Sequence, residues 1–484
     1  MKREDDEIFS HRNLAILTTI LTVAAAVRFV GLDWASVWED EVTYVDLVRT
    51  DGPLALLGEL PKRDAGGSPL YLLLLQAWLT VVGDSIVAAR IPSAVCGTLA
   101  VALVYAIGRR FFDARTGHCA AWLAALNPLD VYHSREVRVY PWLVLLACAG
   151  WYILESFRRS APVAKQVAFA LVLIALLYSH PLGGFMVAAL GVGYLILRLE
   201  TRLRWRNWIV INMATAAAFA PWVTRHLDHA PQVLLERWTA WVLLEWPEGF
   251  TGGRAELVTF CTAMILLGLI GWKNHSTSLR LEAGAKVSLA WFLIPTLLLI
   301  AYSLVSYRIF GPRRYLLFVG PAYLLLVARG ISVLPRRVLQ FAAMAILTVI
   351  AISAMVRRSF ATDRADWKGA ASLIGRQDPR APVIVMDDEN HVAHRACLGI
   401  YLAADQQPIP ARREVTVLAT CRPETLWFVV ETAPRNTALP IPDELTRLYV
   451  AEHSWTLKGV TLIQAHRRQP KIVDRSDDSM FRLR

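Results

Sequence analysis

The chain has 484 residues, of which 55% are hydrophobic and only 19% are charged. Ordinary soluble domains carry about 25% charged residues, so this composition excludes a typical soluble protein of this length. The net charge is +11, but Lys and Arg stand in short clusters between apolar runs, which indicates loop charges that orient a membrane protein and argues against nucleic acid as a partner.

The first apolar run of membrane-spanning length, at 13–31, follows a polar segment at 1–12 that we expect to be cytoplasmic. No signal-peptide cleavage site is evident, so we expect a retained first helix. Similar runs recur to about residue 356, too many and too regularly spaced to be buried helices of a soluble core. We therefore predict a polytopic α-helical membrane protein with its transmembrane domain at 13–357.

The outer loop at 32–67 contains three consecutive carboxylates, Glu39, Asp40 and Glu41. Neighbouring carboxylates repel when both are ionised, so one of them tends to become a usable proton acceptor. An acidic surface loop without function would show the same pattern. We single out Asp40 and Glu41 as candidate catalytic residues because of where the other polar groups of the chain fall.

A short apolar run at 68–83 decides the topology, because a full crossing there would invert every later segment. Lys and Arg are concentrated in one alternate set of loops, which the positive-inside rule makes cytoplasmic. With the N-terminus also inside, 68–83 must be a re-entrant or juxtamembrane helix. We then expect about eleven full spans, in the plasma (inner) membrane, with the C-terminal part outside.

This topology gathers polar side chains from separate helix ends on the outer face, which is the pattern of a functional site. Arginine is well shaped to bind a lipid phosphate, and a neighbouring carboxylate would orient or neutralise it. Snorkelling would also explain the arginines, and a lone histidine at a span end often only packs. The candidate donor-phosphate and substrate-binding residues are Arg90, Arg135, Glu136, Arg138, Tyr140, His180, Arg313 and Arg314.

Metal binding is a further alternative at this face. Asp40, Glu41 and His180 could together ligate a divalent metal ion, but their spacing matches no recognised metal pattern. No cofactor is therefore assigned, and a divalent metal stays an open alternative.

The composition changes near Asp363 to the alternation that is typical of a soluble domain. A helical stretch opens at Asp366, and apolar runs at 382–386, 425–430 and 459–464 predict strands. These elements indicate a small α/β domain after the last span.

The predicted α/β domain occupies 363–469, faces the extracytoplasmic side and is followed by a charged tail at 470–484. It is long enough for a core of its own, and no catalytic motif is recognised in it. Cys397 and Cys421 lie in this domain. They would pair only in an oxidising compartment, so a disulfide between them is left open.

Several motifs occur in a fixed order between residue 13 and about residue 320. They are Asp40-Glu41 after the first span, Ser68-Pro-Leu-Tyr71, Arg90-Ile-Pro-Ser-Ala, and Ser134-Arg-Glu-Val-Arg-Val-Tyr140. This order resembles the GT-C superfamily of integral membrane glycosyltransferases, specifically the bacterial branch similar to protein O-mannosyltransferases and the aminoarabinose transferase of lipid A.

The resemblance implies an inverting sugar transfer from a polyprenyl-phosphate-linked monosaccharide to an acceptor on the outer face of the membrane. It implies that Asp40 is the general base, with Glu41 beside it, and that Arg90 lies near the lipid phosphate. The sequence departs from both branches before its Pro-Leu pair, where Gly67-Ser68 replaces Glu-Lys or His-Pro. Neither specific acceptor is therefore predicted.

Physical reasoning leads to the same kind of site. A polyprenyl-phosphate sugar has its tail in lipid and its phosphodiester at the interface, so cations and a carboxylate should meet at one membrane face. The expected partners are the lipid-linked donor, the bilayer and an unidentified acceptor. A polytopic transporter or lipid flippase is the alternative, but it would show paired repeats and ionisable groups near the midplane.

Overall fold

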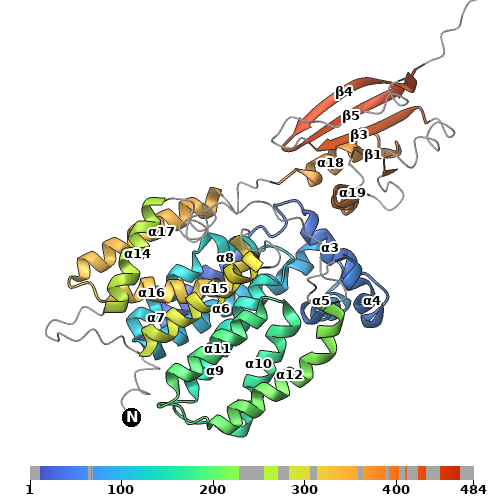
Figure 1. Cartoon of the computed structure of the whole chain (residues 1–484). Helices are drawn as coiled ribbons and strands as arrows, with labels where there is room; N and C mark the ends of the chain where they lie inside the picture. Colours follow the sequence, from blue (N-terminus) through green and yellow to red (C-terminus); the bar gives the residue numbers. More distant parts are fainter. Residues whose placement is uncertain are drawn as a thin grey trace, which may run out of the picture. The chain divides into compact units, whose positions relative to one another are not determined.

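The computed structural model describes residues 11–63, 67, 69–227, 255–270, 283–305, 313–357, 364–386, 392–402, 409–410, 423–431 and 447–468. The chain divides into two compact units, which we describe in turn (Figure 1). The first unit comprises Met1–Trp34 and Thr43–Thr362, and the second comprises Ala35–Val42 and Asp363–Arg484.

The first unit is helical, as the apolar runs predicted. Helix α3 begins in the short segment that belongs to the second unit and continues into the first. The elements in chain order are α2 (His11–Phe29), α3 (Glu39–Val48), α4 (Pro53–Arg63), α5 (Pro69–Val82), α6 (Ile86–Phe111), α7 (Ala114–Ala125), α8 (Pro128–Ser134), α9 (Tyr140–Ser156), α10 (Val163–Ser179), α11 (Gly183–Leu197), α12 (Trp205–Leu227), α14 (Ala255–Ile270), α15 (Ala283–Val305), the 3-10 helix η2 (Arg313–Val319), α16 (Gly320–Ser332) and α17 (Arg337–Met355).

Residues 135–139, which contain Arg135 and Arg138, are called the cationic loop below. Side-chain caps determine where the helices of this region begin. Ser85 caps α6 and Asp113 caps α7, each accepting from a first-turn N–H group. Asn127 caps α8 in the same way, and Pro128 takes the first position, where a missing N–H group costs nothing. The chain therefore breaks between α7 and α9 and presents residues 135–139 as a short loop.

The core of the first unit forms where α6 packs against α7 and α9, and where α16 packs against α7 and α14 (Figure 1). Glycines permit the closest approach: a Cβ atom on Gly108 of α6 would lie 2.9 Å from the Cα atom of Gly117 of α7. Trp151 and Trp291 stack at 5.4 Å and join α9 to α15. Small residues at helix contacts are how membrane helices pack.

Five helices of the described part are long and apolar enough to cross a membrane. Large apolar side chains such as Leu171 and Phe341 are exposed on the outside of the helices, as expected for chain that faces lipid. The predicted fold class, a polytopic helical membrane protein, is confirmed. The number of crossings, about eleven, stays a prediction.

The second unit contains a five-stranded sheet in the order β2-β1-β3-β5-β4 (Figure 1). β1 pairs in parallel with β2 and β3, whereas β5 is antiparallel to β3 and β4. The elements are α18 (Trp367–Gln377), β1 (Val383–Met386), α19 (Val392–Gly399), β2 (Ile409–Pro410), β3 (Thr425–Glu431), β4 (Tyr449–Leu457) and β5 (Val460–Arg467). The predicted small α/β domain is thus confirmed, and the three predicted strands are β1, β3 and β5.

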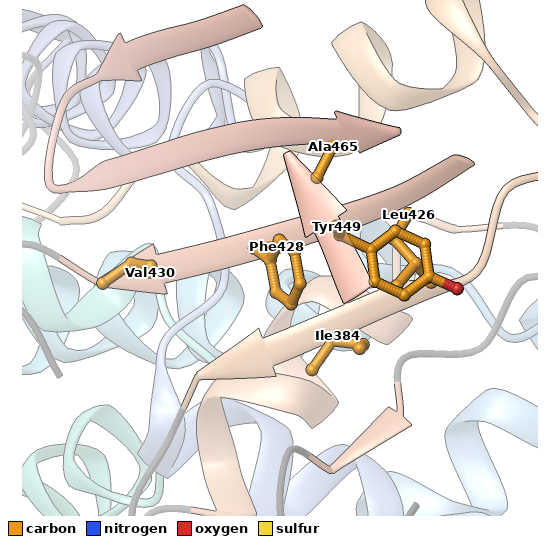
Figure 2. Close-up of a cluster of buried hydrophobic side chains, with 6 residues drawn as sticks. All are labelled: Ile384, Leu426, Phe428, Val430, Tyr449 and Ala465. Atoms are coloured by element: carbon orange, nitrogen blue, oxygen red, sulfur yellow. The ribbon is translucent and has the colours of Figure 1, made fainter. Parts of the chain in front are cut away.

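One face of this sheet carries a buried apolar cluster (Figure 2). Leu426, Phe428 and Val430 alternate along β3, so all three point to the same face. The cluster consists of Ile384, Leu426, Phe428, Val430, Tyr449 and Ala465. Cys397 is buried in α19, and Cys421 lies outside the described residues, so their pairing is not decided.

Candidate active site

The predicted cationic loop is centred on Arg138, just before α9. Its guanidinium group lies 4.8 Å and 5.3 Å from the ring centroids of Tyr44 and Tyr140, and it donates to the Tyr140 hydroxyl at 3.3 Å. The Ser93 hydroxyl donates to the Arg138 carbonyl at 3.1 Å, and the Tyr71 hydroxyl lies 3.2 Å from Ser93 Oγ. Residues from α3, α5, α6 and α9 therefore fix one cation.

Arg90 and Arg135 hold the chain that follows α2. Arg90 is fully buried in α6 and donates to the Leu32 carbonyl at 2.5 Å. Arg135 donates to three carbonyls at the C-terminal end of α2, at 2.5 to 3.1 Å. These are carbonyls that a helix end leaves without an intrahelical donor. Both arginines thus have a structural role here, and their predicted contact with phosphate stays a prediction.

A buried pair that was not predicted stands beside Arg138. His133 Nδ1 lies 2.8 Å from Glu136 Oε2, and the two side chains are 8% and 1% exposed. The His133 ring also meets the Tyr140 ring edge-on at 5.7 Å. The structure gives Glu136 a histidine partner, and its predicted role of orienting or neutralising an arginine stays a prediction. The spacing of three residues was the signal in the sequence, because it places both side chains on one side of a helical turn.

Tyr140, His180 and Tyr315 bring three separate helix ends together. Their ring centroids are 6.0 Å, 6.2 Å and 6.2 Å apart. The Arg314 guanidinium group lies 5.4 Å from the centroid of the Tyr315 ring. Arg138, Tyr140, His180 and Arg314, all singled out from the sequence, therefore belong to one cluster. The side chain of Arg313 lies outside the described residues.

Two further buried polar side chains, Arg28 of α2 and Asp130 of α8, were not singled out from the sequence. Arg28 and Asp130 line one small cavity of about 20 Å³ together with Ser134. Arg28 donates to three backbone carbonyls of α2 and α7 at 2.9 to 3.1 Å. A Cβ atom at Gly97 would meet Ser134 Oγ and Arg28 Nε inside contact distance, so only glycine fits there. These contacts hold the end of α8, where the cationic loop starts.

The acidic segment, residues 36–41, belongs to the second unit. Arg364 donates to the Glu41 carboxylate at 3.0 Å and to the Ser36 carbonyl at 3.3 Å. Glu39 Oε1 lies 2.9 Å from His394 Nε2. The three carboxylates occupy the first turn of α3, where the positive end of the helix dipole stabilises negative charge.

The two predicted catalytic carboxylates differ in their surroundings. The Glu41 side chain is fully buried and forms an ion pair with Arg364, so a substrate hydroxyl cannot reach it without breaking that pair. Asp40 is half-buried. The geometry therefore favours Asp40 over Glu41 as the residue that accepts a proton.

Within the described part of the chain, no group of three or more His, Cys, Asp or Glu side chains is arranged to hold a metal ion. Asp40, Glu41 and His180 are accordingly not found as a ligand set there. A divalent metal is left to experiment.

The family model described as dolichyl-phosphate-mannose-protein mannosyltransferase matches residues 66–224. The match includes the cationic loop and His180, and it begins after the acidic segment. A search of curated proteins finds no match to this chain.

Solved structures share the fold. ArnT from Cupriavidus metallidurans in the apo state is 15% identical, with 93% of this chain and 97% of that chain covered and a TM-score of 0.57. Its structure with undecaprenyl phosphate bound gives 14% identity, the same coverage and the same TM-score of 0.57. The apo oligosaccharyltransferase of Archaeoglobus fulgidus is 10% identical, with 87% and 70% covered and a TM-score of 0.55. The resemblance inferred from the motifs is thereby confirmed, and the chain is a polytopic membrane protein with the fold of the GT-C superfamily of glycosyltransferases.

Proposed function

We propose that the protein is an inverting glycosyltransferase that moves a monosaccharide from a polyprenyl-phosphate donor to a hydroxyl group of a protein, lipid or glycan. The observation that carries the proposal is the convergence of Arg138, His180 and Arg314 around Tyr140. The family match over 66–224 supports it, as does a relative in fold that binds undecaprenyl phosphate.

The chemistry follows from the charges. The bond between the sugar C1 atom and the phosphate oxygen breaks, and polyprenyl phosphate leaves with the electron pair. Arg138 and Arg314 stabilise this anion, because a guanidinium group makes strong charge-assisted hydrogen bonds to phosphate. The acceptor oxygen bonds to C1 from the opposite face, which inverts the configuration, and Asp40 takes the hydroxyl proton.

The reaction should take place outside the inner membrane, where the C-terminal unit is also expected. In a cysteine-free background, Arg376→Cys on α18 should react with a membrane-impermeant maleimide on intact cells, because this side chain is exposed. Arg115→Cys, exposed in the first turn of α7, should react only after permeabilisation. Labelling in the opposite order would place the site in the cytoplasm and contradict the proposal.

Mass spectrometry of glycans and lipids from cells with and without the gene tests the function itself. If the protein is a glycosyltransferase, deletion of its gene should leave one acceptor without its sugar. Expression of the wild-type protein should restore that sugar, whereas expression of Asp40→Asn should not. A flippase would change the distribution of the lipid donor across the membrane and would break no glycosidic bond. Measuring sugar transfer by the purified protein in the presence of EDTA, and then with added Mg²⁺ or Mn²⁺, decides whether a divalent metal takes part.

A further inference from the structure

We propose that Arg364 is a positioning residue of the transfer reaction: it fixes the turn of α3 that carries Asp40. The C-terminal unit, which contains no catalytic motif of its own, would thereby set the position of the general base. This inference rests on the proposed function and deepens it.

Two hydrogen bonds hold the start of the acidic segment. The Ser36 hydroxyl oxygen accepts from the Lys368 N–H group at 3.1 Å, which is a first-turn donor of α18 without an intrahelical acceptor. The Val37 N–H group donates to the Tyr401 hydroxyl at 2.9 Å. Residues from two separate parts of the second unit thus determine where the segment runs before α3 begins.

Arg364 then connects the start of the segment to its end. Its guanidinium group donates to the Ser36 carbonyl and to the Glu41 carboxylate, and it lies 5.5 Å from the centroid of the Trp38 ring. One planar cation therefore bridges both sides of the turn that leads into α3. Both hydrogen bonds come from one nitrogen, Nη1, so the positive charge beside the buried Glu41 is the feature of Arg364 that the turn needs.

The neighbours of Asp40 are anchored on both sides. Glu41 is paired with Arg364, and Glu39 contacts His394, whose ring stacks on Trp367 at 5.7 Å. Successive side chains of an α-helix are rotated by about 100° around its axis, so a small unwinding of the first turn would point Asp40 in another direction. Fixing the two flanking carboxylates therefore fixes the carboxylate between them.

Loss of Arg364 would affect the turn strongly because Glu41 is fully buried. A buried carboxylate without its cation must move toward water or take up a proton. Either response disturbs the first turn of α3, one residue away from Asp40. Arg138 and Arg314, which are proposed to bind the phosphate of the sugar donor, belong to the first unit and take no part in these contacts. Binding of the sugar donor should therefore change little.

Hydrogen exchange tests the anchor without any substrate. Purified full-length protein in detergent is compared as wild type, Arg364→Ala and Arg376→Ala, the last being a matched control at an exposed arginine of α18. The amides of Glu41 and Val42, which donate to the Trp38 carbonyl, report on the turn. We expect about 10-fold faster exchange in peptides covering 36–42 for Arg364→Ala only. Equal exchange in all three proteins would overturn the anchor.

Turnover then tests the role in the reaction. The probe is a set of synthetic undecaprenyl-phosphate monosaccharides. Membranes from cells without the gene supply the acceptor, and the release of undecaprenyl phosphate is measured. We expect kcat of Arg364→Ala to fall about 100-fold with little change in the donor KM, since misplacing a catalytic group by about 1 Å costs this much. Added guanidinium chloride should restore part of the lost kcat in Arg364→Ala. It should not raise the kcat of the control Arg376→Ala.

The outcomes separate the inference from the function. If wild type turns over and Arg364→Ala keeps its kcat, the positioning role is wrong and the proposed function stands. If wild type releases no undecaprenyl phosphate from any probe, the proposed function fails, whereas faster exchange at 36–42 would still establish the anchor. Arg364→Gln, which keeps a hydrogen-bond donor but removes the charge, covers the case of an alanine variant that does not fold, and wild-type kcat in Arg364→Gln would contradict the need for a cation beside Glu41.

Discussion

The candidate cations and the candidate base are held in different ways. Arg138, Arg90 and Arg135 contact rings and backbone carbonyls of the helical unit, where the ends of α2, α6 and α9 meet. The acidic segment is held by side chains from the far end of the chain: Glu41 and Arg364 are 323 positions apart. Helix ends thus hold the arginines that are candidates for phosphate binding, whereas residues from the C-terminal part of the chain hold the acidic segment.

Replacing Asp40 should have the largest effect on the acidic side. Asp40→Asn keeps the size of the side chain but removes the proton acceptor, so we expect transfer to fall about 10³-fold with normal membrane insertion. Asp51→Asn, the same change at an exposed acid between α3 and α4, should leave the rate unchanged. Wild-type rates for Asp40→Asn in the undecaprenyl phosphate release assay would end its assignment as the base.

Replacing Arg138 should affect donor binding. A charge-assisted hydrogen bond contributes about 1.5–3 kcal/mol, so Arg138→Ala should raise the donor KM by about 10- to 100-fold. Arg63→Ala removes an exposed arginine at the end of α4 and serves as the control. A lower kcat at unchanged donor KM would show that Arg138 acts on the acceptor or the base instead.

Arg90 should differ from Arg138 in the quantity that changes. It is fully buried and donates to the Leu32 carbonyl, so Arg90→Ala should lower the free energy of unfolding by about 3 kcal/mol. Thermal unfolding in detergent compares it with Arg138→Ala, which should unfold closer to wild type. An unchanged melting temperature together with a raised donor KM would return Arg90 to the phosphate.

The close packing of Gly97 against Ser134 and Arg28 can be tested by adding a single methyl group. Gly97→Ala places a Cβ atom against Ser134 Oγ and Arg28 Nε, and overpacking of this kind costs about 1–3 kcal/mol. Gly191→Ala is the matched control, because nothing lies within 4 Å of its Cβ position. Equal melting temperatures for the two variants would show that the loop adjusts freely to the added methyl group.

The cationic side was predictable because its signals are local. The positive-inside rule predicted that the ends of several helices share one face, and Arg138, Tyr140, His180 and Arg314 do lie in one cluster, while the side of the membrane stays a prediction. His133 was missed although its spacing to Glu136 was visible, because the nearby Arg135 and Arg138 are equally plausible partners for that carboxylate in the sequence. Arg28 was missed because it stands inside an apolar run, where one cation changes the pattern little.

The acidic side was only half predictable. The triplet at 39–41 was visible, but its partners were not, because no periodicity relates residues more than 300 positions apart. Strands β1, β3 and β5 showed apolar runs, whereas β4 is exposed over most of its length and gave no such signal. Local patterns thus identified the elements, and tertiary contacts decided which of them serve the site.

The membership of residues 35–42 in the C-terminal unit has a consequence for modularity. A chimaera that exchanges everything after α17 with a relative would separate Ser36, Glu39 and Glu41 from the residues that bind them. Exchanging that domain together with the short peptide near the N-terminus would keep the set intact. The two stretches would therefore have to be exchanged together, although more than 300 residues separate them in the chain.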